Sequence, residues 1–289
     1  MIYLLLSIFA STLIFIVFKL FTIYNINTTQ AIVFNYIFAC TSGVLAYDKA
    51  IELPALPNQE WFIGALLLGL VFILIFNCMA ITTQINGLSV AAVASKMSVA
   101  IPIVFGIIVY HETTGVYKIT GIIVALFAVY FTSIKKSTGI RIQKENIIFP
   151  ILVFIGSGFI DTTLKYMELH YVSKNDVPVF SATIFGSAAV LGIISLIYQA
   201  IRKKLRIEFK NIVGGIALGI PNYGSIYFLI QALRSQNLDS STVFTINNVA
   251  ILLVTTLTGI ILFKEKLLVK NWIGIILAIV SILLVAFSI

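Results

Sequence analysis

Charged residues are scarce in this chain, and their scarcity excludes most classes of soluble protein. Asp, Glu, Lys and Arg make up 10% of the 289 residues, whereas a soluble domain usually carries about 25%. Hydrophobic residues make up 60%, so there is too little polar surface to cover a particle dissolved in water. The 22 Phe and 12 Tyr also exclude a disordered chain. The composition therefore predicts an integral membrane protein.

Cysteine is nearly absent, and so are the motifs of common enzymes. The two cysteines, Cys40 and Cys78, both lie inside apolar segments, which indicates neither a disulfide framework nor a thiolate metal site. The residues after His111 do not complete a zinc-binding HExxH pattern, and no Walker A sequence occurs. We therefore expect no metal, no cofactor and no enzymatic activity.

The net charge of +8 does not indicate nucleic acid in a chain this apolar. Basic residues in short loops between membrane helices face anionic lipid headgroups. The expected partner is thus the lipid bilayer, and nucleic acid is not expected. The basic loops favour both termini outside the cytoplasm.

Ten apolar segments of 17 to 24 residues follow one another along the chain. This length suits membrane helices, because lipid leaves no hydrogen-bonding partner for an open strand. The sequence predicts an all-α integral membrane fold with about ten transmembrane helices. The expected segments are Ile2–Tyr24, Ala31–Tyr47, Trp61–Thr83, Leu88–Tyr110, Tyr117–Ile134, Ile147–Leu169, Val177–Ala200, Ile212–Leu233, Ser240–Phe263 and Trp272–Ile289.

Three short patterns recur in the second half of the chain. Their offset grows from 146 through 150 to 153 residues, as loop insertions in one copy would produce. An odd number of helices per copy inverts the second copy in the membrane, so we expect a five-helix repeat at 1–134, a basic linker loop at 135–146 and an inverted repeat at 147–289. The matches are Ser11-(x7)-Lys19 with Ser157-(x7)-Lys165, Gly64-(x4)-Gly69 with Gly214-(x4)-Gly219, and His111-Glu112-(x8)-Gly121 with Lys264-Glu265-(x8)-Gly274.

The five-plus-five plan and the repeated Glu-to-Gly motif resemble the EamA-like family of the drug/metabolite transporter superfamily. The resemblance implies ten helices, a central cavity and transport of small metabolites, often outward. It also implies termini inside the cytoplasm, against the distribution of basic loops. One departure is Thr255, which stands where the first copy has Pro102, so the expected helix bend is absent from the second copy.

Several ionisable residues fall inside the apolar segments, where a charge costs about 2.5–3.5 kcal/mol on insertion scales. Lys96 lies eight residues into its segment, roughly 12 Å deep, and it either faces a cavity or forms an ion pair within the protein. Lys19 and Lys165 occupy matched positions nearer to helix ends, so their shared purpose is structural or functional.

Asp161, Lys165 and Glu168 are spaced so that they share one helical face. Two interpretations stay open at this point. Asp161 and Lys165 neutralise each other to lower the insertion cost, or Asp161 is a carboxylate that binds a proton and couples transport to a proton gradient.

Neutral polar residues either bind a substrate or tie helices together. Pro221 and the residues up to Gly224 are expected to break their helix and free backbone carbonyls towards a cavity. Glu112 and Glu265 are expected to fix loop geometry rather than to bind substrate, and Gly215 and Gly219 to pack helices. The amide-bearing candidates are Asn77, Gln84, Asn247 and Asn248.

Together these residues predict a secondary-active transporter, an exporter of a small polar or amphipathic metabolite such as an amino acid, working by alternating access. Rival interpretations are a lipid-linked sugar flippase, a passive channel and a non-transporting membrane scaffold subunit. We expect a multi-pass protein of the bacterial cytoplasmic membrane, as a monomer or homodimer. The predicted substrate-binding residues are Lys19, Asn77, Lys96, Lys165, Tyr223 and Asn248, and the predicted coupling carboxylate is Asp161.

Overall fold

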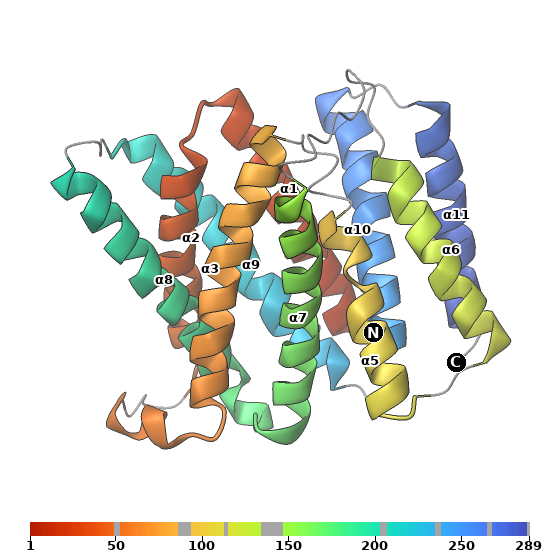
Figure 1. Ribbon diagram of the computed structural model, residues 1–289, viewed down its shortest axis with the longest axis horizontal. Helices are drawn as coiled ribbons and strands as arrows, with labels where there is room; N and C mark the ends of the chain where they lie inside the picture. The colour runs from red at the N-terminus through yellow and green to blue at the C-terminus, as the bar shows by residue number, and fades with distance from the viewer. Residues whose placement is uncertain are drawn as a thin grey trace. The chain divides into compact units, whose positions relative to one another are not determined.

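The protein is mainly helical in the part of the chain that its computed structural model describes, which is residues 1–48, 53–85, 94–112, 115–133, 147–202, 207–234, 238–264 and 268–287 (Figure 1). Within those ranges no strand occurs, which confirms the all-α prediction. The α-helices are α1 (Ile2–Ile23), α2 (Thr28–Leu45), α3 (Phe62–Ile85), α5 (Ala100–Val109), α6 (Val116–Ser133), α7 (Ile148–His170), α8 (Val177–Ile201), α9 (Phe209–Leu233), α10 (Ser240–Phe263) and α11 (Val269–Ala286), and the short 3-10 helices are η1 (Leu53–Asn58) and η3 (Lys174–Asp176).

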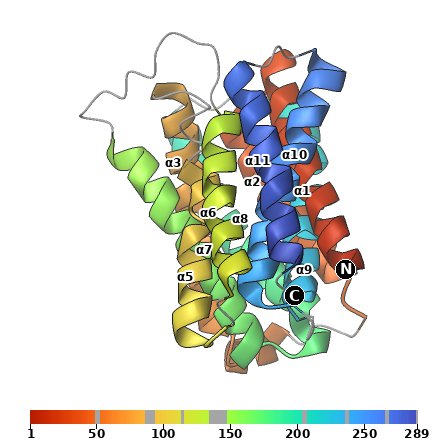
Figure 2. The same ribbon diagram turned by 90° about the vertical axis from the view of Figure 1, so that its right-hand side faces the viewer.

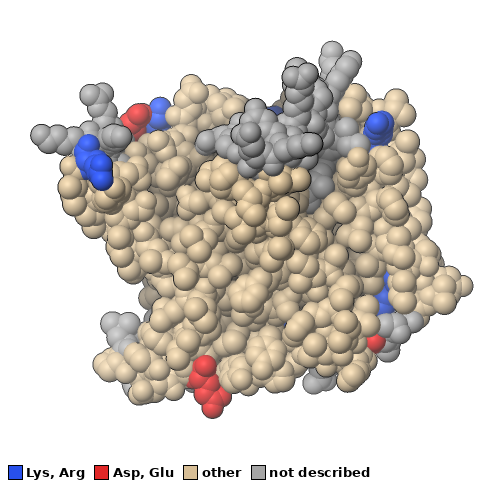
Figure 3. Space-filling model, viewed as in Figure 1, with Lys and Arg blue, Asp and Glu red and all other residues tan. Residues whose placement is uncertain are grey.

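Seven helical segments of the described chain are long and apolar enough to cross a membrane, which makes this a multi-pass membrane protein. Two shorter apolar stretches, Ala94–Val109 and Val116–Phe131, fall below that length, so the total of ten spans stays a prediction. Figure 3 shows the charged side chains near the upper and lower margins of one face, with uncharged residues between them. That distribution is expected where lipid surrounds the middle of each helix.

The chain forms two compact units, each built from two separate stretches of sequence. Unit 1 comprises Met1–Leu74 and Thr163–Arg234, and unit 2 comprises Ile75–Thr162 and Ser235–Ile289. Each unit thus combines helices from the first and the second half of the chain. The units are defined by contacts between residues, whereas the repeats were predicted from matching sequence patterns. The units therefore do not test the boundaries of the two repeats, which remain a prediction.

Glycines let the helices of unit 1 approach closely. A Cβ on Gly219 of α9 would lie 2.6 Å from the backbone oxygen of Asn35 on α2. A Cβ on Gly69 of α3 would lie 2.4 Å from the backbone oxygen of Ile184 on α8. Small residues permit such contacts between membrane helices. Both glycines therefore serve helix packing in unit 1.

Amide side chains join α2 to α9 inside unit 1. The Nδ2 of Asn211 donates to the Oε1 of Gln30 at 2.7 Å, and the Nδ2 of Asn222 donates to the Oδ1 of Asn35 at 3.0 Å. All four side chains are buried. Interhelical hydrogen bonds of this kind fix how two membrane helices align along their length.

In unit 2 the most extensive helix contact joins α6 to α11, which lie side by side in both views (Figures 1 and 2). The hydroxyl of Ser281 donates to the backbone oxygen of Gly121 at 2.8 Å. Nearby, Ala125 and Ala128 of α6 pack with Val249 of α10 in a buried apolar cluster. Gly121 is the last residue of the repeated Glu-to-Gly motif, so this glycine also serves helix packing.

α5 and α10 end in the same way. Tyr110 caps α5 and is followed by His111 at φ 51°, and Phe263 ends α10 before Lys264 at φ 52°. This left-handed conformation is rare for residues other than glycine and is typical of helix C-termini. The two positions are those that the sequence pattern matched at an offset of 153 residues.

Proline had the expected effect in one helix and not in another. The segment predicted at Leu88–Tyr110 is interrupted by a turn at Ser98–Val99, shortly before Pro102, whereas α10 is continuous through Thr255. The prediction of a break at Pro221 was wrong, because α9 runs unbroken from Phe209 to Leu233. Asn222, which follows this proline, is held by its bond to α2, and such tertiary contacts override the local preference.

Candidate functional site

Lys96 is held by an oriented amide on α10 within unit 2. Among the described residues it lies in the helical stretch 94–97, and its Nζ donates to the Oδ1 of Asn248 at 3.3 Å. The Nδ2 of Asn248 donates in turn to the backbone oxygen of Phe244 at 3.0 Å. This second bond fixes the amide so that its oxygen faces the lysine.

Asp161 of α7 belongs to the same unit and interacts electrostatically with Lys96. Both side chains are half-buried. A lysine, a carboxylate and an amide therefore occupy apolar helices whose other residues offer little to a charge. This arrangement can bind an anionic group at Lys96 and hold a proton at Asp161.

The turn at Ser98–Val99 places Lys96 beside irregular backbone. Val99 N donates weakly to the backbone oxygen of Lys96 at 3.5 Å, and Ile101 N donates to that of Ser98 at 2.9 Å. Pro102 has no N–H to give Ser98 the usual helical bond. Interrupted helices at membrane depth are tolerated where they are buried in protein or line a cavity.

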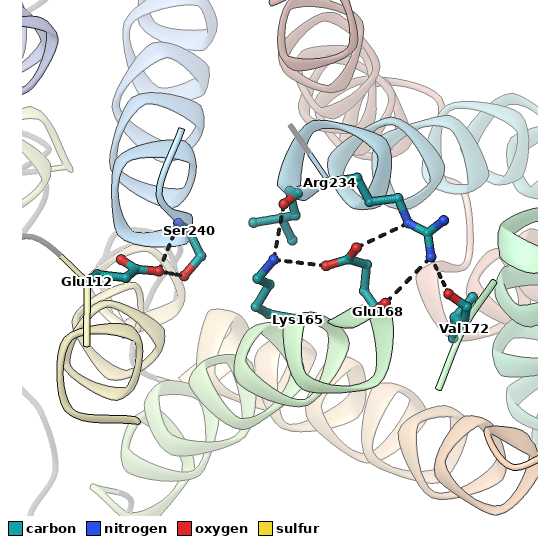
Figure 4. Close-up of polar contacts among 7 residues, drawn as sticks. Glu112, Lys165, Glu168, Val172, Arg234 and Ser240 are labelled. Carbon is teal, nitrogen blue, oxygen red and sulfur yellow. Dashed lines mark hydrogen bonds and ion pairs between the residues drawn. The ribbon is translucent and has the colours of Figure 1, made fainter. Parts of the chain in front are cut away.

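A second group of charges lies in unit 1 at the ends of α7 and α9 (Figure 4). Lys165 Nζ lies 2.9 Å from Glu168 and donates to the backbone oxygen of Leu233 at 3.0 Å. Arg234 lies 3.1 Å from Glu168 and also donates to the backbone oxygen of Val172. Lys165 thus has Glu168 as its carboxylate partner, and the three side chains tie two helix ends together.

Glu112 binds the start of α10 in unit 2 (Figure 4). Its carboxylate accepts from the backbone N–H of Ser240 at 2.9 Å, from that of Ser241 at 3.0 Å and from the Ser240 hydroxyl. Beside it, Lys118 is paired with Asp239 at 2.6 Å. Glu112 therefore fixes local geometry, as expected, while Glu265 lies outside the described residues.

The remaining predicted residues are distributed over both units. Lys19 on α1 is half-buried, Asn77 on α3 is exposed, and Tyr223 on α9 is buried and stacks on Tyr227 with ring centres 5.7 Å apart. Lys19, Lys165 and Tyr223 belong to unit 1, while Asn77 belongs with Lys96, Asp161 and Asn248 to unit 2. Their roles in substrate binding stay predictions.

Sequence reasoning missed two residues, Arg234 and Lys118. Neither was among the predicted site residues, yet Lys118 is only 2% exposed and Arg234 is 16% exposed at its side chain. Their partners lie on distant segments, so no local spacing reveals them. Among the described residues, no group of three His, Cys, Asp or Glu side chains could hold a metal ion.

Comparison with known proteins gives the class first. A chain from a protein crystal structure matches with a TM-score of 0.76, covering 99% of this chain and 99% of that one, at 12% identity, so the two share a fold. The model of the EamA-like transporter family matches residues 144–287. A protein of Haemophilus influenzae (strain ATCC 51907 / DSM 11121 / KW20 / Rd), described as uncharacterized, is 30% identical over 266 residues, covering 89% of this chain and 88% of the relative.

This is a multi-pass membrane protein of a transporter class. It belongs to the EamA-like transporter family, within the drug/metabolite transporter superfamily.

Proposed function

We propose that the protein is a secondary-active exporter of a small polar or amphipathic metabolite that carries a carboxylate, such as an amino acid. It works by alternating access between two inverted repeats, in the cytoplasmic membrane of a bacterium. Membership of the transporter family supports the class, and the bacterial relative supports the location.

The observation that carries the proposal is the contact of Lys96 with Asn248 in the presence of Asp161. A lysine in an apolar segment costs about 2.5–3.5 kcal/mol on insertion scales, so its retention calls for a purpose. A structural ion pair needs only two opposite charges, yet here an amide is also held in place by its own backbone bond. Oriented polar groups around one charge are typical of a binding site.

In the proposed cycle the substrate carboxylate binds Lys96, and Asn248 orients the substrate through its amide. The amino group of a substrate such as an amino acid binds Asp161 in place of a proton. After release outside the cell Asp161 binds a proton, which is released to the cytoplasm when the next substrate binds, so proton and substrate move in opposite directions. Asn77, which belongs to the same unit, would contact another part of the substrate, and the binding roles of Lys19, Lys165 and Tyr223 stay predictions from the sequence.

The first test is Lys96→Ala, with Lys210→Ala as the matched control, because Lys210 is 43% exposed in a surface ion pair. The purified protein is screened for thermal stabilisation by amino acids, organic acids, sugars, nucleosides and lipid headgroups, since a ligand at 100 times its Kd adds about 2.7 kcal/mol. Uptake of each stabilising compound is then measured in proteoliposomes.

Lys96→Ala should lower kcat/KM for the carboxylate substrate at least 100-fold, which is about 2.7 kcal/mol, while Lys210→Ala transports normally. Unchanged kinetics in the folded Lys96 variant would remove this residue from the site. Stabilisation by lipid headgroups alone would favour a flippase. Flux that shows neither saturation nor counterflow would favour a channel, and the absence of any stabilising ligand would favour a scaffold.

A further inference from the structure

The N-terminus of α10 is capped by a residue from another segment of the chain and not by its own N-cap residue. Asp239 is the N-cap by position, with extended backbone at φ −64° and ψ 152°, yet its side chain makes no capping hydrogen bond. An aspartate at this position normally accepts from the first free amides of its own helix. Instead Glu112, from beyond the end of α5, accepts from Ser240 N and Ser241 N.

Asp239 fails to cap α10 because its carboxylate pairs with Lys118 at 2.6 Å. The same Lys118 Nζ lies only 3.9 Å from Glu112. Two carboxylates therefore compete for one helix N-terminus, which carries a partial positive charge, and one lysine lies within reach of both. Lys118 is 2% exposed and Glu112 7%, so neither charge can be left without a partner cheaply.

From these contacts we propose that Glu112, Lys118 and Asp239 form a latch that opens by exchanging partners. In the closed state, seen here, Glu112 caps α10 and Lys118 pairs with Asp239. In the open state Asp239 caps its own helix and Lys118 pairs with Glu112.

The exchange leaves each of the three charged side chains with a partner, and the Ser241 amide with an acceptor, on both sides of the opening. Glu112 and Lys118 flank a short connection between α5 and α6, and Asp239 directly precedes α10. When the two sides separate, the α5–α6 side keeps Glu112 paired with Lys118. The α10 side keeps Asp239 with the partial positive charge of its own helix N-terminus. Bistable elements of this kind allow a transition between two arrangements at low net cost.

The latch joins a segment of the first half of the chain to one of the second half, which are the parts that move in alternating access. The inference therefore rests on the proposed function for its purpose, but the exchange itself is a property of these three side chains. The role of the latch in transport and the exchange of partners are therefore measured separately.

Transport is tested with a disulfide that locks the latch. A Cβ on Gly106 would lie 3.0 Å from the Ser240 hydroxyl oxygen, near the separation of about 3 Å that disulfide geometry requires between a Cβ and the partner sulfur. Gly106→Cys/Ser240→Cys is made in a Cys40→Ala/Cys78→Ala parent. The control is Gly121→Cys/Val285→Cys, where the Cβ of residue 121 would lie 2.7 Å from a methyl carbon of Val285.

Oxidation of the locking pair should lower transport at least tenfold, and reductant should restore it. Oxidation of the control pair, which joins α6 to α11, should change nothing. Full transport by the oxidised locking pair would overturn the latch and leave the proposed function intact, since the parent still transports.

Partner exchange is tested without any substrate, by hydrogen exchange at the Ser241 amide, which Glu112 caps here and which an N-cap Asp239 can also reach. Glu112→Ala, Asp239→Ala and the double variant are compared in a Lys118→Met background, which removes the buried lysine from the comparison. If each carboxylate replaces the other as the cap, the double variant exchanges at least tenfold faster than the product of the single effects predicts. Independent effects would overturn the exchange, whether or not the parent transports any compound.

Discussion

The segment at 94–109 and helix α10 occupy equivalent places in the predicted repeats, but they differ in helix continuity and in charge. The first is interrupted at Ser98–Val99 and carries Lys96. The second is continuous, and at the position equivalent to Lys96 it has Val249, which is buried in an apolar cluster. The segment at 94–109 thus provides the charge and the irregular backbone, and α10 provides the regular helix and the amide of Asn248 that contacts the charge.

This difference indicates that a repeated fold does not require a symmetric site. Equivalent helices keep matched ends at His111 and Lys264, since these determine where the chain turns. Their central residues differ, as the proposed function requires of a site for an asymmetric substrate. The three predictions below test whether the two segments can be exchanged.

The largest effect is expected when the charge is moved to the continuous helix. Val249 is 1% exposed among apolar neighbours, so Val249→Lys should lower the free energy of unfolding by about 4 kcal/mol. Val249→Ala, which loses packing but adds no charge, should cost about 2 kcal/mol. Thermal stability in detergent distinguishes the two, and equal losses would show that position 249 tolerates a charge as position 96 does.

A smaller loss is expected when the proline is moved. Thr255 lies in the interior of α10, and its hydroxyl donates to the backbone oxygen of Ile251 at 2.6 Å. Thr255→Pro removes a helical hydrogen bond and should cost about 3 kcal/mol. Thr255→Ala separates the loss of the hydroxyl from the effect of proline. A Thr255→Pro protein as stable as Thr255→Ala would mean that α10 accommodates a break.

The smallest effect is expected from the reverse change in the interrupted segment. Pro102 is the third residue of α5, where a missing N–H costs little. Pro102→Thr should therefore change stability by less than about 1 kcal/mol, while exchange at the neighbouring Ile101–Ile103 amides slows as the break closes. A stability gain above about 2 kcal/mol would show instead that the proline imposes strain on the native helix.

The regular features of the fold were predictable because they depend on local composition. Ser240–Phe263 was predicted with the bounds that the structure gives α10. The packing role of Gly219 followed from its spacing to Gly215, and the fixing role of Glu112 followed from its place at the edge of a loop. Each of these inferences needs only the neighbouring residues and one repeat of the pattern.

The tertiary features were not predictable, because they depend on residues that meet only in the folded chain. Lys118 was not among the predicted site residues, and its pairing with Asp239 spans 121 residues of sequence. Pro221 was expected to break α9, but that helix is unbroken, and the residue after the proline is bonded to α2. Lys165 pairs with Glu168, a choice between carboxylates on one helical face that spacing alone does not decide.

The amide bonds between α2 and α9 have a consequence for how the protein is made. Gln30 and Asn35 enter the membrane early in synthesis, but their partners follow 181 and 187 residues later. At a synthesis rate of about 5–20 residues per second, roughly 10 to 40 seconds pass before these partners are made. During that time lipid offers the two amide side chains of α2 no hydrogen-bonding partner. The first stretch of unit 1 thus remains dependent on the insertion machinery until α9 emerges, and a truncation before residue 211 would leave it a substrate for membrane quality control.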